Sequence, residues 1–427
     1  MASFDIEPEF AAQLEWIREF VATEIEPLDA LLGTEEVVYD KSHPVHDEVI
    51  RPLQDRVRAQ GLWSCHLTPD FGGQGYGQVK LAYMNEILGR SSFAPSVFGC
   101  QAPDSGNAEI VAHYGTPEQK AQFLQPLLDG RISSCYSMTE PQGGADPSLF
   151  TTSAVRDGDE WVIDGEKWFS SSFERAAFII VMAVTDPDVS VYQGSSMFLV
   201  PADTPGLEII RRVGMGYDAV EAGNHPYVRY NSVRVPVENL LGGEGQAFTI
   251  AQTRLGGGRL HHAMRTVGVV ARCFDMLCER ALSRTTQGEL LARKQMTQEK
   301  IADAWIELTQ FRLQVLHAAW CVDTKGAHAA RREIAGVKVA TPTVFHDAVM
   351  RTIQLHGALG VSNEMPLAKM LLGSLSLGLA DGSTEVHKIS LARQVLKDYR
   401  AVDGMWPTEH IPTRVVAATE RYGSLLS

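Results

Sequence analysis

The spacing of hydrophobic residues divides the chain into three zones. In residues 1–131, segments such as LEWIREFVATEI repeat apolar side chains at intervals of three and four, as amphipathic helices do. In residues 132–245, short runs such as AAFIIVMAVTD are rich in β-branched residues and are separated by turn residues, which predicts strands. From 246 to about 400 the helical period returns in long segments. The pattern therefore predicts helices, then a β domain, then helices.

These zones predict an α+β multidomain protein, and a length of 427 residues is expected to give two or three domains. The short strands of the middle zone predict a small antiparallel barrel or sandwich. Three or four long helices in 246–400 predict a bundle. Residues 401–427, which contain Pro407 and Pro412, predict irregular structure or a short docking arm.

Charge and hydropathy exclude several classes of protein. The chain has 38 Lys and Arg against 52 Asp and Glu, a formal net charge of −14. This argues against nucleic acid as the main partner, because phosphate binding needs a concentration of positive charge. No apolar run approaches the roughly 20 residues that span a bilayer, and the acidic N-terminus does not resemble a signal peptide. We therefore expect a cytoplasmic enzyme without nucleic-acid partner or transmembrane segment.

The cysteines do not suggest a metal site. All six are scattered, at positions 65, 100, 135, 273, 278 and 321, without a Cys-x-x-Cys pair or zinc-type spacing. The pair His261-His262 also suits a metal poorly, because adjacent residues of a helix point in different directions. We predict free thiols, packed or phosphate-facing histidines, and no metal.

Two segments of the middle zone carry candidate chemistry. In CYSMTEPQGGADPS, residues 135–148, a strand runs into Thr139 and two glycines, which leaves backbone amides available to a flat ligand. In DGEKWFSSS, residues 164–172, Trp168 and Phe169 stand beside three serines. Each segment has a plain alternative, a strand turn for the first and core aromatics for the second. Their combination is more specific than either.

A third candidate is Asp381 in GLADGSTEVHKISLAR, residues 378–393. The carboxylate follows apolar residues and precedes Gly382, where a helix is expected to begin near Ser383 or Thr384. A turn or a helix cap is the alternative interpretation of such an Asp.

From about residue 10 to 400, the chain resembles the acyl-CoA dehydrogenase family. The resemblance rests on MTEP-x-G-G-x-D, GEKWF and DGSTEVHKISLAR, which occur in that order. It implies an N-terminal α-helical domain, a middle antiparallel β-barrel domain and a C-terminal four-helix bundle. It also implies an FAD enzyme of fatty acid β-oxidation that desaturates an acyl-CoA between its α and β carbons and passes electrons to an electron-transfer flavoprotein.

The resemblance also assigns residues. Arg284 would bind the pyrophosphate of FAD held by a neighbouring subunit, which implies a homodimer or homotetramer; otherwise Arg284 is a solvated helix charge. Gln287 stands where the family usually has Phe. The positions implied to bind the cofactor are Tyr136, Met138, Thr139, Gly144, Phe169, Ser171, Arg284, Gln287, Gln295, Gln354, Gly357, Ser383 and Glu385. Those implied to bind substrate are Ala145, Arg259 and Gly382.

Asp381 matches the catalytic base of the family, which is usually Glu. Removing a weakly acidic α-proton requires a carboxylate near the α-carbon that is shielded from water. Asp shortens the reach by one C–C bond, and a displacement of about 1 Å can cost on the order of 100-fold in rate. Some branches place the base one residue before the bundle arginine, but here Gly258 precedes Arg259, so that position carries no carboxylate.

The closing Asp-Gly-x-x-Glu-Val-His, together with APDSGNAE and GGGRLHH, most resembles the branch of acyl-CoA dehydrogenase family members ten and eleven, without their extra N-terminal domains. Glycines 256–258 suggest a wide pocket. Three alternatives stay open: a nitroalkane oxidase, which also uses Asp as base, a flavin hydroxylase on the same fold, and a non-enzymatic scaffold.

Overall fold

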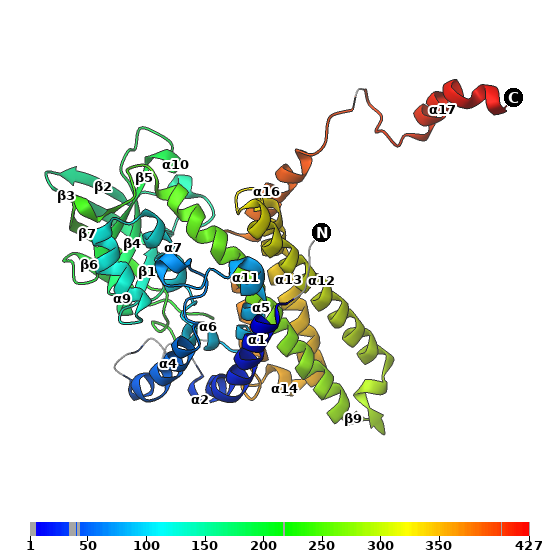
Figure 1. Cartoon of the computed structure of the whole chain (residues 1–427), viewed down its shortest axis with the longest axis horizontal. Coiled ribbons are helices and arrows are strands. Elements are labelled where there is room, and N and C mark those ends of the chain that lie inside the picture. The colour runs from blue at the N-terminus through cyan, green and yellow to red at the C-terminus, as the bar shows by residue number, and fades with distance from the viewer. Residues whose placement is uncertain (1–5, 34–39, 41–42, 217, 403, 427) are drawn as a thin grey trace.

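The computed structural model describes residues 6–33, 40, 43–216, 218–402 and 404–426. Figure 1 shows a β region on one side of the molecule, helices on the other, and one terminal helix that extends away from both. No helix in the described part of the chain is long and apolar enough to cross a membrane.

The N-terminal zone is helical, as its hydrophobic period predicts. A capping box begins α8: Thr116 Oγ1 accepts a hydrogen bond from Gln119 N at 3.2 Å, and Gln119 Oε1 accepts one from Thr116 N at 3.1 Å. The helices are α1 Pro8–Phe20, α2 Glu26–Leu32, α4 Arg51–Ala59, α5 Gly77–Leu88, α6 Ala94–Val97, α7 Asp104–Tyr114, α8 Pro117–Gln119 and α9 Gln125–Leu128.

The middle zone forms one sheet, with strand order β6-β7-β3-β2-β4-β5-β8 and with β1 paired to β4. Most pairs are antiparallel, but β4 pairs in parallel with β1 and, at one position, with β2. A purely antiparallel arrangement is therefore not observed, because β1 enters the sheet directly from the helical region and runs alongside β4. The strands are β1 Ser134–Ser137, β2 Ser153–Asp157, β3 Glu160–Lys167, β4 Phe178–Val184, β5 Ser195–Pro201, β6 Leu207–Arg211, β7 Tyr227–Pro236 and β8 Leu240–Leu241.

The C-terminal zone is a helical bundle organised around α11, Ala247–Ser283, which has 37 residues. It packs with α12 Gln295–Lys325 and α13 Arg331–His356, and α13 packs with α15 Leu367–Leu377 and α16 Thr384–Leu396. The short strands β9 Thr285–Thr286 and β10 Glu289–Leu290 form a hairpin between α11 and α12, and α14 Ala358–Val361 follows α13.

The sequence predicts irregular structure or a short docking arm for residues 401–427, and the described part of this segment contains a helix that was not predicted. Helix α17 occupies Ile411–Leu426, with Pro412 as its second residue. Proline is tolerated there because the first turn of a helix has no internal partner for its N–H. Figure 1 shows α17 beyond the bundle, at the end of an extended linker.

Two glycines allow α5 and α11 to cross at backbone contact. A Cβ at Gly268 of α11 would lie 2.0 Å from the carbonyl oxygen of Glu86, and a Cβ at Gly89, after α5, would lie 2.0 Å from that of Arg265. No side chain fits at either position without separating the N-terminal region from the bundle.

This crossing predicts the effect of Gly268→Val. We expect it to lower the free energy of unfolding by about 3 kcal/mol, because the side chain must displace a backbone. Gly256→Ala is the control in the same helix, since a Cβ there meets no atom within 4 Å. It should be neutral or stabilising by up to about 1 kcal/mol. Guanidinium unfolding followed by circular dichroism measures both, and equal stabilities would contradict the interpretation.

Candidate active site

Asp381 lies in the tight loop between α15 and α16. Its φ is +55° and that of Gly382 is +93°, so two successive residues adopt left-handed conformations that Asp and Gly tolerate better than most. The carbonyl oxygen of Asp381 accepts hydrogen bonds from Arg259 Nε at 3.0 Å and from His387 Nε2 at 3.1 Å. The loop is therefore fixed by its backbone, and α16 begins at Thr384, as the sequence predicts.

The carboxylate of Asp381 faces α11. Its side chain is 17% exposed, and Oδ2 lies 3.5 Å from Nε2 of His262. A Cβ at Gly258 would lie 3.1 Å from the same oxygen. Glycine at 258 therefore leaves room for Asp381, and an acidic side chain there would meet the carboxylate.

Basic groups surround this carboxylate. Lys338 of α13 is buried and donates to the carbonyl oxygen of Leu377. Burial lowers the pKa of Lys338 to about 8, and the charge of Asp381 opposes that shift. Burial likewise lowers the pKa of His262, again against the influence of Asp381. Sequence reasoning considered His262 as packed or phosphate-facing and did not consider Lys338.

A second carboxyl group approaches the same turn of α11. A Cβ at Gly257 would lie 3.2 Å from Oε2 of Glu109, which α7 supplies. Burial raises the pKa of Glu109 to about 7, and the neighbouring Arg254 opposes the rise. Sequence reasoning missed Glu109, although the glycine run that accommodates it was visible: adjacent glycines inside a helix each cost about 1 kcal/mol and call for a packing or functional reason.

Arg254 connects α11 to the β domain. Its guanidinium carbon lies 3.9 Å from the centre of the Tyr136 ring, and its Nε donates to Oδ1 of Asn107 at 2.9 Å. The amide of Asn107 in turn donates to Oγ of Ser134 at 2.9 Å. The predicted cofactor residue Tyr136 is thus brought beside the helix that carries Gly258 and Arg259.

The two motifs of the middle zone lie against each other. Trp168 N donates to the carbonyl oxygen of Thr139 at 2.8 Å. Lys167 and Glu140, both without exposed side-chain surface, form an ion pair at 2.8 Å, and Lys167 also donates to the carbonyl oxygen of Met138 at 2.8 Å. Burial lowers the pKa of Lys167 to about 8, and Glu140 opposes the shift. The Glu and the Lys of the motifs therefore hold the two loops together.

The second motif presents an aromatic group to solvent. Phe169 has φ +55° and is 41% exposed, and its ring stacks on His225 with centroids 5.4 Å apart. Ser171 Oγ lies 2.7 Å from Nδ1 of the same histidine. Among the described residues, the indole Nε1 of Trp168 is buried without a hydrogen-bond partner. An exposed ring, an unused donor and the adjoining end of β1 fit a flat, polar-edged ligand such as a flavin.

The other predicted residues divide between exposed positions and the far end of α11. Gly144 and Ala145 are exposed, and it is Gly143 that packs closely, with a Cβ 2.9 Å from the ring of Phe150. Glu385 is also exposed, and Ser383 is the N-cap of α16.

Arg284 and Gly357 meet at the opposite end of the bundle. Arg284 Nη1 donates to the carbonyl oxygen of His356 at 3.4 Å, and Gly357 follows with φ +67°. Gln287, in the β9–β10 turn, has φ +51°, and Gln295 and Gln354 are exposed. Arg284 is 26 positions from Gly258, or about 39 Å along the helix. Arg284 therefore lies far along α11 from Gly258, the residue that faces Asp381.

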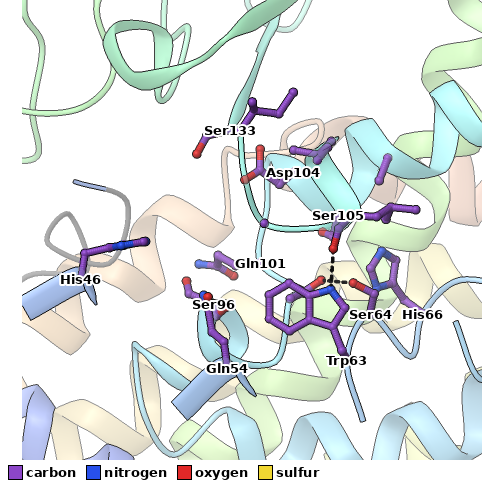
Figure 2. A pocket seen from close by; sticks show the side chains of 16 residues that line it. His46, Gln54, Trp63, Ser64, His66, Ser96, Gln101, Asp104, Ser105 and Ser133 are labelled. Atoms are coloured by element: carbon purple, nitrogen blue, oxygen red, sulfur yellow. Dashed lines mark hydrogen bonds between the residues drawn. The ribbon is translucent and has the colours of Figure 1, made fainter. Parts of the chain in front are cut away.

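A small cavity lies apart from these groups, between α4, α6 and α7 (Figure 2). Its volume is about 60 Å³, and Gln101, Ser105 and His66 are among its lining residues. Burial lowers the pKa of His66 to about 4, so its imidazole is neutral. The cavity suits a few water molecules rather than an acyl chain, and it contains no predicted site residue.

In the described part of the chain, no group of three or more His, Cys, Asp or Glu side chains is arranged to hold a metal ion. The six cysteines are free thiols, five of them buried.

Three family comparisons match the chain. The acyl-CoA dehydrogenase N-terminal domain matches residues 7–131, the middle domain matches 135–227 and the C-terminal domain matches 245–396. Among solved structures, a putative acyl-CoA dehydrogenase from Mycobacterium abscessus is 39% identical with a TM-score of 0.85 and covers 93% of this chain and 100% of that one. Butyryl-CoA dehydrogenase from Megasphaera elsdenii shares the fold, with 24% identity and a TM-score of 0.79. The match covers 92% of this chain and 100% of that one.

Curated relatives agree with the predicted branch. Rat acyl-CoA dehydrogenase family member 11 is 42% identical, over 83% of this chain and 46% of its own length. Mouse acyl-CoA dehydrogenase family member 10 is 38% identical, over 90% of this chain and 36% of its own length. The chain thus spans less than half the length of these relatives. Probable acyl-CoA dehydrogenase FadE2 of Mycobacterium tuberculosis is 40% identical over 82% of this chain and 86% of its own length. The chain belongs to the acyl-CoA dehydrogenase family.

Proposed function

We propose that the protein is an FAD-dependent dehydrogenase that removes the α-proton of an acyl-CoA with Asp381 and so forms an α,β double bond. The observation that carries the proposal is the placement of Asp381: a largely buried carboxylate in a loop fixed by Arg259 and His387. Family membership supports an acyl-CoA dehydrogenase activity, and this carboxylate supplies the base that the reaction requires.

The surroundings of Asp381 favour its role as a base. Its exposure of 17% limits access of water, which would otherwise solvate and weaken the base. Nε2 of His262 lies 3.5 Å from Oδ2 of Asp381, and the charge of Asp381 opposes the lowering of the pKa of Lys338 by burial, so both basic groups lie near the proposed base. Arg259 and His387 bind the carbonyl oxygen, so the position of the short Asp side chain is set by the main chain. Gly258 and Gly382 keep the surrounding backbone free of side chains.

The same geometry supports the proposed flavin-binding residues. Tyr136, Met138 and Thr139 at the end of β1, with Phe169 and Ser171 across from them, would hold the ring system, and Trp168 Nε1 has an unused donor to offer. Bound FAD supplies the acceptor for the β-hydride. Gly144, Ser383 and Glu385 remain proposed cofactor contacts, and Ala145, Arg259 and Gly382 remain proposed substrate contacts.

Arg284, Gln287, Gln295, Gln354 and Gly357 are proposed to bind the cofactor of a neighbouring subunit. The separation of about 39 Å along α11 supports this, because it is too long for one dinucleotide to contact both Arg284 and the Asp381 region of the same chain. A homodimer or homotetramer follows from the proposal. We also propose a cytoplasmic location, a role in fatty acid β-oxidation and an electron-transfer flavoprotein as acceptor.

One alternative has a specific observation behind it. A nitroalkane oxidase also uses Asp at the base position. This oxidase and a flavin hydroxylase on the same fold would both react with oxygen. Their behaviour in air separates them from a dehydrogenase, which should reoxidise slowly with oxygen.

The Asp381→Asn variant tests the proposed base. We expect it to retain flavin and bind acyl-CoA but to lose at least about 1,000-fold in the rate of flavin reduction, because the amide cannot accept the proton. The measurement is anaerobic bleaching of the flavin by a panel of short, long, branched, aromatic and 4-phosphorylated acyl-CoA thioesters. Asp188→Asn, in an exposed turn, is the control.

Two outcomes would contradict this proposal. If Asp381→Asn reduced its flavin at the wild-type rate, Asp381 would not be the base. If no thioester bleached the wild-type flavin and nitroalkanes or aromatic substrates turned over in air, the oxidase or hydroxylase alternative would replace it.

The Glu109→Gln variant tests whether ionisation of the buried Glu109 carboxyl group lowers the stability of the protein. The pKa of Glu109 is about 7 in the folded protein and 4.5 ordinarily, so between these values the folded state binds more protons than the unfolded state, and the contribution of Glu109 to stability falls as pH rises through this range. Glu109→Gln should match wild type near pH 4.5 and be more stable by about 2–3 kcal/mol at pH 8. Guanidinium unfolding at both pH values measures this, and a pH-independent difference would refute it.

A further inference from the structure

The imidazole of His262 lies beside the carboxylate of Asp381, on the face of α11 that Gly258 leaves open. Nε2 of His262 is 3.5 Å from Oδ2 of Asp381. Gly258 and His262 are four residues apart, so they share one face of the helix, and a side chain at 262 leans back over the turn that contains 258. Because a Cβ at Gly258 would lie 3.1 Å from the same carboxylate oxygen, the glycine keeps open the space in which the two groups meet.

The other basic groups of this loop bind main-chain oxygens and not the carboxylate. Arg259 and His387 both donate to the carbonyl oxygen of Asp381, at 3.0 and 3.1 Å. Lys338 donates to another main-chain carbonyl. A guanidinium or an ammonium group has no lone pair with which to accept a proton. Among the described residues, the imidazole of His262 is therefore the group next to the carboxylate oxygen that can take a proton from it.

The surroundings of His262 keep its imidazole ready to accept a proton. Burial lowers its pKa, and the charge of Asp381 opposes that shift. Three neighbouring cations lower the pKa further, namely Arg265, Lys338 and Arg254. The imidazole is therefore neutral at pH 7. Its side chain is 31% exposed against 17% for that of Asp381, so water reaches the imidazole more readily than the carboxylate.

The proposed base must lose the α-proton before each new turnover. A bound acyl chain excludes water from a carboxyl group that is already largely buried, so direct release of the proton to solvent becomes slow. The 3.5 Å contact with His262 is longer than a hydrogen bond of usual length, but such contacts in ligand-free sites often tighten when substrate binds. The imidazole thus offers a shorter route than bulk water.

We propose that His262 relays the α-proton from Asp381 to solvent; this inference rests on the proposed function of Asp381 as the base. In the transfer, the Oδ2–H bond of protonated Asp381 breaks and an Nε2–H bond forms on His262, while the electron pair of the broken bond stays on Oδ2. The carboxylate is thereby regenerated, and the imidazolium gives a proton to water. The reverse sequence returns a solvent proton to the α-carbon, so the relay also exchanges α-hydrogens with solvent.

Exchange of α-hydrogens in D2O measures the relay apart from hydride transfer. The probe is a 3-thia-acyl-CoA, in which sulfur replaces the β-carbon, so that no β-hydride can leave. We expect the FAD-loaded wild type to introduce deuterium, followed by mass spectrometry, and His262→Gln to do so at least about 10-fold more slowly, because an amide cannot accept the proton. Single-turnover flavin reduction by a normal acyl-CoA should change by less than about 3-fold, since Asp381 is retained.

The neighbouring histidine provides the matched control. His261 points away from Asp381, and its Nε2 lies 3.3 Å from Oε1 of Gln78. His261→Gln removes an imidazole from the next position of the same helix and should exchange α-hydrogens at the wild-type rate. Equal slowing by His261→Gln and His262→Gln would overturn the relay, because it would indicate a general disturbance of α11.

Chemical rescue separates proton transfer from a structural role. His262→Ala leaves a space beside Asp381, and the partial exposure of the native side chain lets added imidazole enter it. We expect imidazole to restore α-hydrogen exchange in His262→Ala and to have no effect on Asp381→Asn. Exchange that imidazole does not restore would overturn the relay.

Two results distinguish failure of the relay from failure of the proposed function. Wild-type exchange in His262→Gln, together with bleaching of the flavin by an acyl-CoA, would overturn the relay and leave Asp381 as the base. A wild-type flavin that no thioester bleaches, with no exchange of the 3-thia probe, would overturn both.

Discussion

The rest of the structure depends on the burial of one helix, α11, by the N-terminal helices, the β domain and the other helices of the bundle. Its first turns supply Ala247 and Ile250 to the core beneath the sheet, and its middle supplies Met264 and Val267 to the core of the N-terminal helices. Further along, it enters two cores of the bundle. The approach of α5 at Gly268 fixes its position to within backbone contact. Because the helix is shared, the positions of the β domain and the N-terminal helices around the site are set together.

The proposed site lies where this helix is weakest as a helix. Glycines 256–258 lower its intrinsic stability, and in exchange they admit Glu109 from α7 and Asp381 from the loop before α16. The long buried segments on either side compensate for that loss. A continuous helix with a local gap in its side chains therefore provides rigid positions for groups that come from three separate parts of the chain.

The sequence allowed much of the fold and part of the site to be predicted. The hydrophobic period predicted the order of helices and strands, because it reports which face of each element is buried. The parallel pairing of β1 and β4 and the helical state of residues 411–426 were not predicted, since both depend on neighbours that local pattern does not encode. Pro412 does not interrupt α17, because it stands in the first turn of that helix.

By itself, the sequence determined the chemistry that the chain carries: a carboxylate at Asp381, no carboxylate at 258, two motifs in the β zone and an arginine at each of 259 and 284. Only the tertiary structure decided which groups act together. It placed His262 and Lys338 near Asp381 and Glu109 against Gly257 of α11, and it put Arg284 just beyond the far end of the same helix. The reason is that pKa values, shielding and reach depend on distances between residues remote in sequence, and those distances are set by packing.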